Sequence, residues 1–141
     1  VIAVSDYVRD VLLRSGFAPS HVSTIHHCTN IEAFSPQSVT VSADAVRRKW
    51  GIASDETRMV VGFAGRFVEN KGGDVLLKAL AQSPQVIGVM LGDGLCKNEW
   101  MQWAKNAGIV HDRLVWGGFR KDIENCLNAF DVFVLPSVHP E

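Results

Sequence analysis

The chain has 141 residues, of which 47% are hydrophobic and 21% charged, and its formal net charge is −1. A chain of this length makes about one domain and can build a core without disulfides or a metal. The balanced charge excludes a global basic field for nucleic acid, and the composition excludes a disordered chain. Three scattered cysteines without a C-x-x-C pair predict neither a disulfide scaffold nor a cysteine zinc site. No apolar run reaches about 18 residues, so no membrane span is predicted and any membrane contact would be peripheral.

The N-terminal part predicts one strand–helix unit and a second strand. Residues 1–4 are strand-like, and Ser5 is placed to cap a helix that ends near Gly16. Residues 21–27 alternate roughly between polar and apolar and predict the second strand. Residues 28–42 are polar and contain Pro36, so we expect a junction between domains there.

The rest of the chain alternates apolar strands with amphipathic helices. Strands are predicted at 59–64, 86–91, 113–116 and 132–135, and helices at 42–51, 74–82, 97–107 and 121–130. Short, nearly continuous apolar strands joined by helical crossovers predict an α/β fold with a Rossmann-like parallel sheet covered by helices on both faces. The chain begins without Met and stops after a strand, which we interpret as a segment of a longer protein.

The loops that follow the strands are predicted to meet at the carboxyl edge of this sheet, where open α/β folds bind ligands. The first loop, residues 65–73, carries Arg66 and Lys71 between glycines and ahead of a helix, a pattern suited to a phosphate. The alternative is that both cations are solvated and pair with Glu69 and Asp74. Neither a P-loop nor a G-x-G-x-x-G pattern is present, so this loop by itself favours the alternative.

The other loops give weaker signals of the same kind. Gly92, Asp93 and Gly94 permit either a tight turn or contact with a ligand, and Phe119 with Arg120 can flank a planar base or simply pack at the surface. Glu141 offers carboxylate oxygens to sugar hydroxyls, or is merely exposed.

Three further groups are interpreted as structural. His26, His27 and Cys28 lie on a predicted strand whose neighbours point to opposite faces, so they do not predict a metal site. Trp100 and Trp103 have the spacing of one helical face and predict packing. Cys126 belongs to an apolar stripe and is not placed beside a general base.

In order along the chain, these pieces resemble the group 1 glycosyltransferases of the GT-B fold. The resemblance rests on the landmarks 4–6, 25–36, 65–72, 92–94, 117–118 and 131–137, and it covers essentially the whole chain. It implies three regions: 1–36 as the end of the N-terminal acceptor domain with the start of the hinge, 37–56 as a linker with a short helix, and 57–141 as a donor-nucleotide-binding Rossmann-like domain that is incomplete at its C-terminus.

The resemblance also implies roles for individual residues. Arg66 and Lys71 match the basic pair that binds the donor diphosphate and stabilises the leaving group without a metal, and Glu141 matches the first carboxylate of a paired-glutamate motif that contacts the transferred sugar. Gly65, Gly92, Asp93 and Gly94 lie where the backbone meets the donor, and Phe119 and Arg120 where the family holds the base. The implied reaction transfers a hexose, with retention, from a UDP-, GDP- or ADP-sugar to a hydroxyl of a polysaccharide, a lipid-linked glycan or a small molecule.

Departures from the family limit these expectations. The hinge reads His27-Cys28-Thr29-Asn30 where the family has an Asn-Gly-x-Asp turn, and the second glutamate would fall beyond Glu141. A segment that ends there is expected to bind donor weakly and not to turn over. The resemblance implies a cytoplasmic protein, with peripheral contact to the inner face of the membrane as one option. A non-catalytic nucleotide-binding or scaffolding module stays open as the alternative, and a receiver-like domain is disfavoured because no aspartate ends a central strand.

Overall fold

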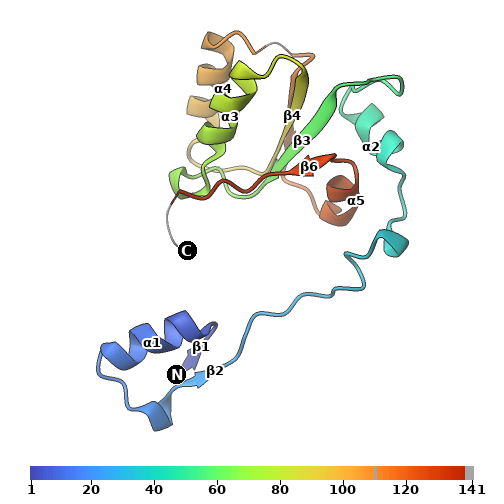
Figure 1. The fold of residues 1–141 in the computed structure, drawn as a ribbon. Coiled ribbons are helices and arrows are strands. Elements are labelled where there is room, and N and C mark those ends of the chain that lie inside the picture. Colours follow the sequence, from blue (N-terminus) through green and yellow to red (C-terminus); the bar gives the residue numbers. More distant parts are fainter. Residues whose placement is uncertain (110, 139–141) are drawn as a thin grey trace. The chain divides into compact units, whose positions relative to one another are not determined.

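The computed structural model describes residues 1–109 and 111–138. Its internal contacts divide the chain into two units, Val1–Ala33 and Phe34–Glu141, and each unit has its own parallel sheet (Figure 1). The predicted division into 1–36, 37–56 and 57–141 stays a prediction. Among the residues described, no helix is long and apolar enough to cross a bilayer.

The first unit is a pair of short strands joined by a helix. Its elements are β1 (Ile2–Ala3), α1 (Asp6–Arg14), the 3₁₀ turn η1 (Pro19–His21) and β2 (Ser23–Thr24). As predicted, Ser5 caps α1, because its hydroxyl accepts a hydrogen bond from the Val8 amide at 3.2 Å. The predicted strand at 21–27 is wrong in length. Pro19 begins a 3₁₀ turn that occupies the start of this range, and β1 offers only two residues for pairing.

The second unit alternates strands and helices in the predicted order. Its elements are η2 (Pro36–Ser38), α2 (Ala43–Lys49), β3 (Met59–Ala64), η3 (Glu69–Lys71), α3 (Gly73–Gln82), β4 (Val86–Leu91), α4 (Lys97–Asn106), β5 (Leu114–Gly118), α5 (Ile123–Asn128) and β6 (Val132–Phe133). The predicted bounds of β3 and β4 are confirmed. The last strand is shorter than the predicted 132–135, because only two of its residues pair with β3.

The strands of the second unit run parallel in the order β5-β4-β3-β6. β3 pairs with β4 along its whole length, from Met59 opposite Val86 to Ala64 opposite Leu91. The chain therefore steps outward from β3 to β4 and β5, and then returns to the other side of β3 as β6. Because all four strands are parallel, their carboxyl ends lie at one edge, where open α/β sheets take their ligands.

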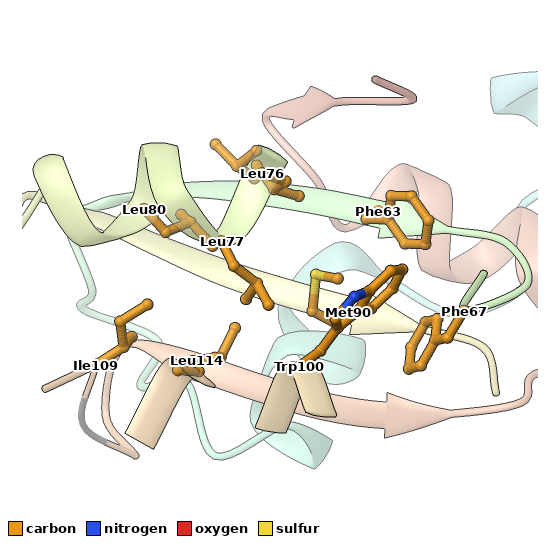
Figure 2. Close-up of a cluster of buried hydrophobic side chains, with 11 residues drawn as sticks. Phe63, Phe67, Leu76, Leu77, Leu80, Met90, Trp100, Ile109 and Leu114 are labelled. Atoms are coloured by element: carbon orange, nitrogen blue, oxygen red, sulfur yellow. The ribbon is translucent and has the colours of Figure 1, made fainter. Parts of the chain in front are cut away.

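Helices cover both faces of this sheet, as predicted. Figure 2 shows the cluster on one face, where leucines of α3 and Trp100 of α4 meet Phe63 and Met90 of the strands. Alternate strand residues, among them Val60 and Ile87, point to the other face and pack with Cys126 of α5. The α/β prediction is thereby confirmed.

The two tryptophans of α4 do not share one environment. Trp100 is 3% exposed and lies edge-on to Phe63, with ring centroids 6.4 Å apart. Trp103 is 37% exposed. Three residues advance a helix by about 300°, which puts Trp103 at the border of the buried stripe. The predicted packing role is therefore confirmed for Trp100 and only partly met by Trp103.

A carboxylate ties the edge strand to its neighbours. Asp131, just before β6, accepts hydrogen bonds from the Val60 amide at 2.7 Å and from Arg47 of α2 at 2.9 Å. The Arg47 side chain also donates to the Ala129 carbonyl at 2.8 Å. Asp131, one of the landmarks of the family resemblance, thus joins α2, β3 and the start of β6.

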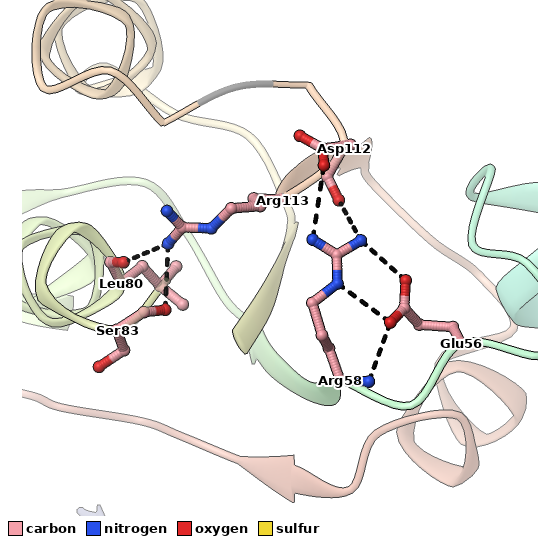
Figure 3. A network of polar contacts seen from close by, with 6 residues as sticks. All are labelled: Glu56, Arg58, Leu80, Ser83, Asp112 and Arg113. Atoms are coloured by element: carbon pink, nitrogen blue, oxygen red, sulfur yellow. Dashed lines mark hydrogen bonds and ion pairs between the residues drawn. The ribbon is translucent and has the colours of Figure 1, made fainter. Parts of the chain in front are cut away.

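A second polar network lies at the amino ends of the strands, away from the loops of interest (Figure 3). Arg58 donates to Glu56 through Nη2 at 2.7 Å and through Nε at 3.0 Å, and it pairs with Asp112 at 3.4 Å. Arg113 donates to the carbonyls of Leu80 and Ser83, at the end of α3. These contacts fasten the segments that lead into β3 and β5.

Candidate functional site

A cavity of about 390 Å³ lies at the carboxyl ends of β3, β4 and β5. Six residues predicted as site residues line it: Gly65, Arg66, Gly92, Asp93, Phe119 and Arg120. They come from three separate loops. The lining also includes Ala64, Leu91 and Ile123, which the sequence analysis did not single out because single apolar residues at strand and helix ends carry no functional pattern.

Backbone hydrogen bonds hold two of these loops together. The Gly65 amide donates to the Leu91 carbonyl at 3.0 Å, and the Phe67 amide donates to the Asp93 carbonyl at 2.9 Å. The Cys96 amide in turn donates to the Phe67 carbonyl at 2.9 Å. Phe67 itself is 1% exposed and packs on Trp100, with centroids 5.3 Å apart. The lining at Arg66 and Asp93 is thus anchored by the core beneath it.

The glycines of the second loop are required by this close packing. Gly92 has φ +133°, and a Cβ there would lie 1.9 Å from the Gly65 carbonyl oxygen. A Cβ at Gly94 would lie 2.5 Å from the Phe67 carbonyl oxygen. Two hypotheses apply to Gly92 and Gly94, a tight turn or contact with a ligand. The close packing of the two loops is enough to explain both glycines without a ligand. Gly92 also lines the cavity, whereas Gly94 is not among its lining residues.

Arg66 is an exposed cation on the cavity wall. Within the described part of the chain it makes no ion pair, and Asp74, one of its predicted alternative partners, instead pairs with Lys78 at 2.8 Å. The hypothesis that Arg66 is neutralised by a neighbouring carboxylate is therefore not met among the described residues. An unpaired guanidinium beside a concave surface is suited to an anionic ligand.

Neither Lys71 nor Glu141 is among the described residues that line the cavity. Lys71 ends η3, is partly buried and is not among the residues that line the cavity. Glu141 lies outside the described residues. The last described residues do approach the loop of Lys71, since the Val138 amide donates to the Asn70 carbonyl at 3.1 Å. Gly72, at φ +67°, allows the same approach, because a Cβ there would lie 1.9 Å from the Pro136 carbonyl oxygen.

Asp93 contributes a paired negative charge at the cavity. Its carboxylate accepts hydrogen bonds from Lys97 at 2.7 Å and from the Gly94 amide at 2.8 Å. The hydrogen bond from Lys97, and then that from Gly94, lower the pKa of Asp93. The group is therefore ionised at neutral pH and is already compensated by Lys97.

Phe119 and Arg120 supply two planar groups at the β5 end of the cavity. The Phe119 side chain is 75% exposed. Arg120 is held by Asp122, whose carboxylate accepts from Nε at 2.9 Å and from Nη2 at 2.7 Å. Asp122 was not among the predicted site residues. The signal available was an Arg-x-Asp spacing just before a helix, which is common at surfaces and points to no particular chemistry.

The described residues also line cavities outside this site. One of about 670 Å³ is lined by α4 and β5 residues, among them Met101, Lys105 and Trp116, and by none of the predicted site residues. Another, of about 290 Å³, is an apolar groove between α3 and β6. Within residues 1–109 and 111–138, no group of three or more His, Cys, Asp or Glu side chains is arranged to hold a metal ion.

Comparison with known proteins identifies relatives of the chain. Residues 44–141 match the family described as Glycosyl transferases group 1. The lipopolysaccharide core biosynthesis glycosyltransferase LpsE of Rhizobium meliloti (strain 1021) is 40% identical over 80 residues, which is 57% of this chain and 23% of LpsE. The putative glycosyltransferase EpsF of Bacillus subtilis (strain 168) is 28% identical over 130 residues, covering 89% of this chain and 33% of EpsF.

Solved structures agree with these matches. The crystal structure of Anabaena HepE in complex with UDP and glucose aligns with all of this chain at a TM-score of 0.80 and 29% identity, and the chain covers 38% of it. The predicted GT-B fold is thereby confirmed. The chain spans between about a quarter and two fifths of the length of these relatives.

Proposed function

The chain belongs to the group 1 glycosyl transferases, and we propose that its cavity at the carboxyl ends of β3, β4 and β5 binds the nucleotide part of a sugar donor. The observation that carries the proposal is the meeting of three loops around one hollow whose wall holds Arg66, a cation without an ion pair among the described residues. HepE, at 29% identity over the whole of this chain, has been crystallised with UDP. Structures of HepE with UDP-glucose support the same class of ligand here.

In the proposed reaction, a hexose passes from the nucleoside diphosphate to a hydroxyl of a glycan, lipid-linked or small-molecule acceptor, with retention. Breaking the bond between sugar and phosphate places new negative charge on the departing diphosphate. The Arg66 guanidinium interacts more strongly with that charge than with the intact donor, which lowers the barrier. Lys71 is proposed to add a second positive charge, and Glu141 to contact the transferred sugar.

The base is proposed to lie at the other end of the cavity, against Phe119 and Arg120. Their planar groups can stack on a ring without reading its identity. This division assigns the diphosphate to the Arg66 loop and the base to the β5 loop. In this scheme, positively charged side chains stabilise the leaving group, and this stabilisation does not depend on a metal ion.

The test is a thermal-shift and calorimetric panel of UDP, GDP, ADP and their glucose conjugates on the complete protein, since a ligand that binds only the folded state raises the melting temperature. We expect one nucleotide class to bind. Arg66→Ala should then weaken its binding about 10- to 100-fold, the range for losing a hydrogen bond to a charged group.

Lys78→Ala is the matched control, because Lys78 is an exposed cation whose partner is Asp74 and it is not among the cavity's lining residues. Equal affinities for the wild type and Arg66→Ala would contradict the proposal. Binding without any sugar transfer to a panel of acceptors would favour the non-catalytic nucleotide-binding module over the enzyme.

A further inference from the structure

Asp122 does not make the hydrogen bond to the helix backbone that an aspartate at the start of a helix usually makes. It is the N-cap residue of α5, yet its side chain makes no capping hydrogen bond to the helix. Both carboxylate oxygens are instead used by Arg120, at 2.9 Å and 2.7 Å. Asp122 itself is not among the residues that line the cavity, whereas Arg120 is.

The pairing limits what Arg120 can offer to a ligand. A guanidinium grips a phosphate best through a pair of adjacent N–H groups, and the Nε–Nη2 edge of Arg120 is already occupied. Its charge is compensated as well. The Nη1 group and the planar face remain, and Phe119, which is exposed, lines the same cavity.

Arg120 is supported from the helix as well. The buried Cys126 thiol of α5 interacts with its guanidinium, and burial raises the pKa of that thiol. Cys126 therefore stays neutral near pH 7 and does not compete with Asp122 for the charge. Arg66 differs from Arg120 in exposure and in pairing, since it is exposed and makes no ion pair among the described residues.

We propose that Asp122 is a positioning residue that fixes Arg120 as a flat, charge-compensated platform for the nucleotide base, and so leaves phosphate binding to the Arg66 loop. The inference rests on the proposed function, because it presupposes a nucleotide in this cavity. It adds a residue outside the cavity wall that decides which part of the ligand Arg120 recognises.

The experiment compares three probes on the complete protein by calorimetry: the nucleoside diphosphate that binds among UDP, GDP and ADP, its nucleoside, and inorganic pyrophosphate. For Asp122→Asn we expect the nucleoside and the nucleoside diphosphate to bind about two- to thirtyfold more weakly, the range of a stacked guanidinium. Pyrophosphate should bind as well as before, or more tightly because the freed Arg120 fork can reach it. Arg66→Ala should instead weaken the binding of pyrophosphate and of the nucleoside diphosphate, and leave the nucleoside affinity unchanged.

Two variants separate positioning from a general effect on α5. Glu124→Gln removes a negative charge from the first turn of the same helix and should leave all three affinities unchanged. Asp122→Glu keeps a carboxylate for Arg120 and should restore part of the nucleoside affinity. A merely structural role would weaken every probe alike and would not be rescued by glutamate.

The outcomes are distinct for the two proposals. If the wild type binds none of the three nucleotides, the proposed function fails and this inference fails with it. If the wild type binds a nucleotide but Asp122→Asn binds the nucleoside equally well, or loses nucleoside and pyrophosphate to the same extent, only the assignment of Asp122 is overturned.

Discussion

Gly92 illustrates how one residue can serve a site by permitting contact between loops. Its missing Cβ lets the second loop approach the Gly65 carbonyl, and its amide donates to the Gly118 carbonyl at 2.8 Å. Gly92 thus contacts the loop after β3 and the last residue of β5 from the loop after β4. A side chain there would have to push apart the loops that line the cavity.

We therefore expect Gly92→Ala to lower the free energy of unfolding by more than the roughly 1–2 kcal/mol that a left-handed backbone alone costs an L-residue. Gly51→Ala is the control, because Gly51 has φ +79° but a Cβ added there would meet nothing within 4 Å. Urea unfolding of both variants measures the difference. A loss at Gly92 no greater than that at Gly51 would mean that the close contact with Gly65 does not constrain the fold.

At the residue scale, the sequence placed Arg66 and Phe119 in loops just after strands, and both line the cavity. Their roles in binding stay predictions. Asp122 was missed because its importance lies in a contact with Arg120 that no spacing rule specifies. The roles assigned to Lys71 and Glu141 rest on the loop pattern and on family resemblance, and they stay predictions.

At the scale of elements, the Glu56 network fastens the two chain segments that lead into β3 and β5. The hydrogen bond from Arg58 lowers the pKa of Glu56 from 4.5 to about 2. A carboxylate whose pKa is lower in the folded state stabilises the protein above its unfolded pKa, and this stabilisation is lost as pH falls toward the folded value. The contribution of Glu56 is therefore present near neutral pH and fades from about pH 4.5 toward pH 2.

Glu56→Gln should accordingly be less stable than the wild type at pH 7, with a gap that narrows as the pH drops below 4.5. Urea denaturation at a series of pH values measures it. In an Arg58→Gln background the same substitution should have little pH-dependent effect, because Glu56 has lost its main donor. A gap that is constant with pH, or that persists in this background, would rule out the network as its cause.

Strand prediction was accurate for the central strands and poor for strands at the edge of a sheet. β3 and β4 have the predicted bounds, since each is an apolar run that pairs along its whole length. The strands predicted at 21–27 and 132–135 have only two residues each, because β1 offers two residues to the first and the second pairs with β3 at Val132 and Phe133 alone. That information lies in the tertiary fold and is absent from the local pattern.

At the scale of the molecule, the topology explains why distant residues share one site. The parallel order β5-β4-β3-β6 sends the loops after β3, β4 and β5 to one edge, so residues near positions 66, 93 and 120 line one cavity. The sequence could predict this convergence from handedness rules alone. It could not predict the depth of the hollow, which depends on how Phe67 packs beneath the loops.

The most direct test of the account is a crystal structure of the complete protein with the nucleoside diphosphate that binds it. We predict that the ligand occupies the cavity of about 390 Å³, with its diphosphate contacting Arg66 and its base against Phe119 and Arg120. A nucleotide seated instead in the larger hollow beside α4, or one whose phosphates lie away from Arg66, would contradict the account.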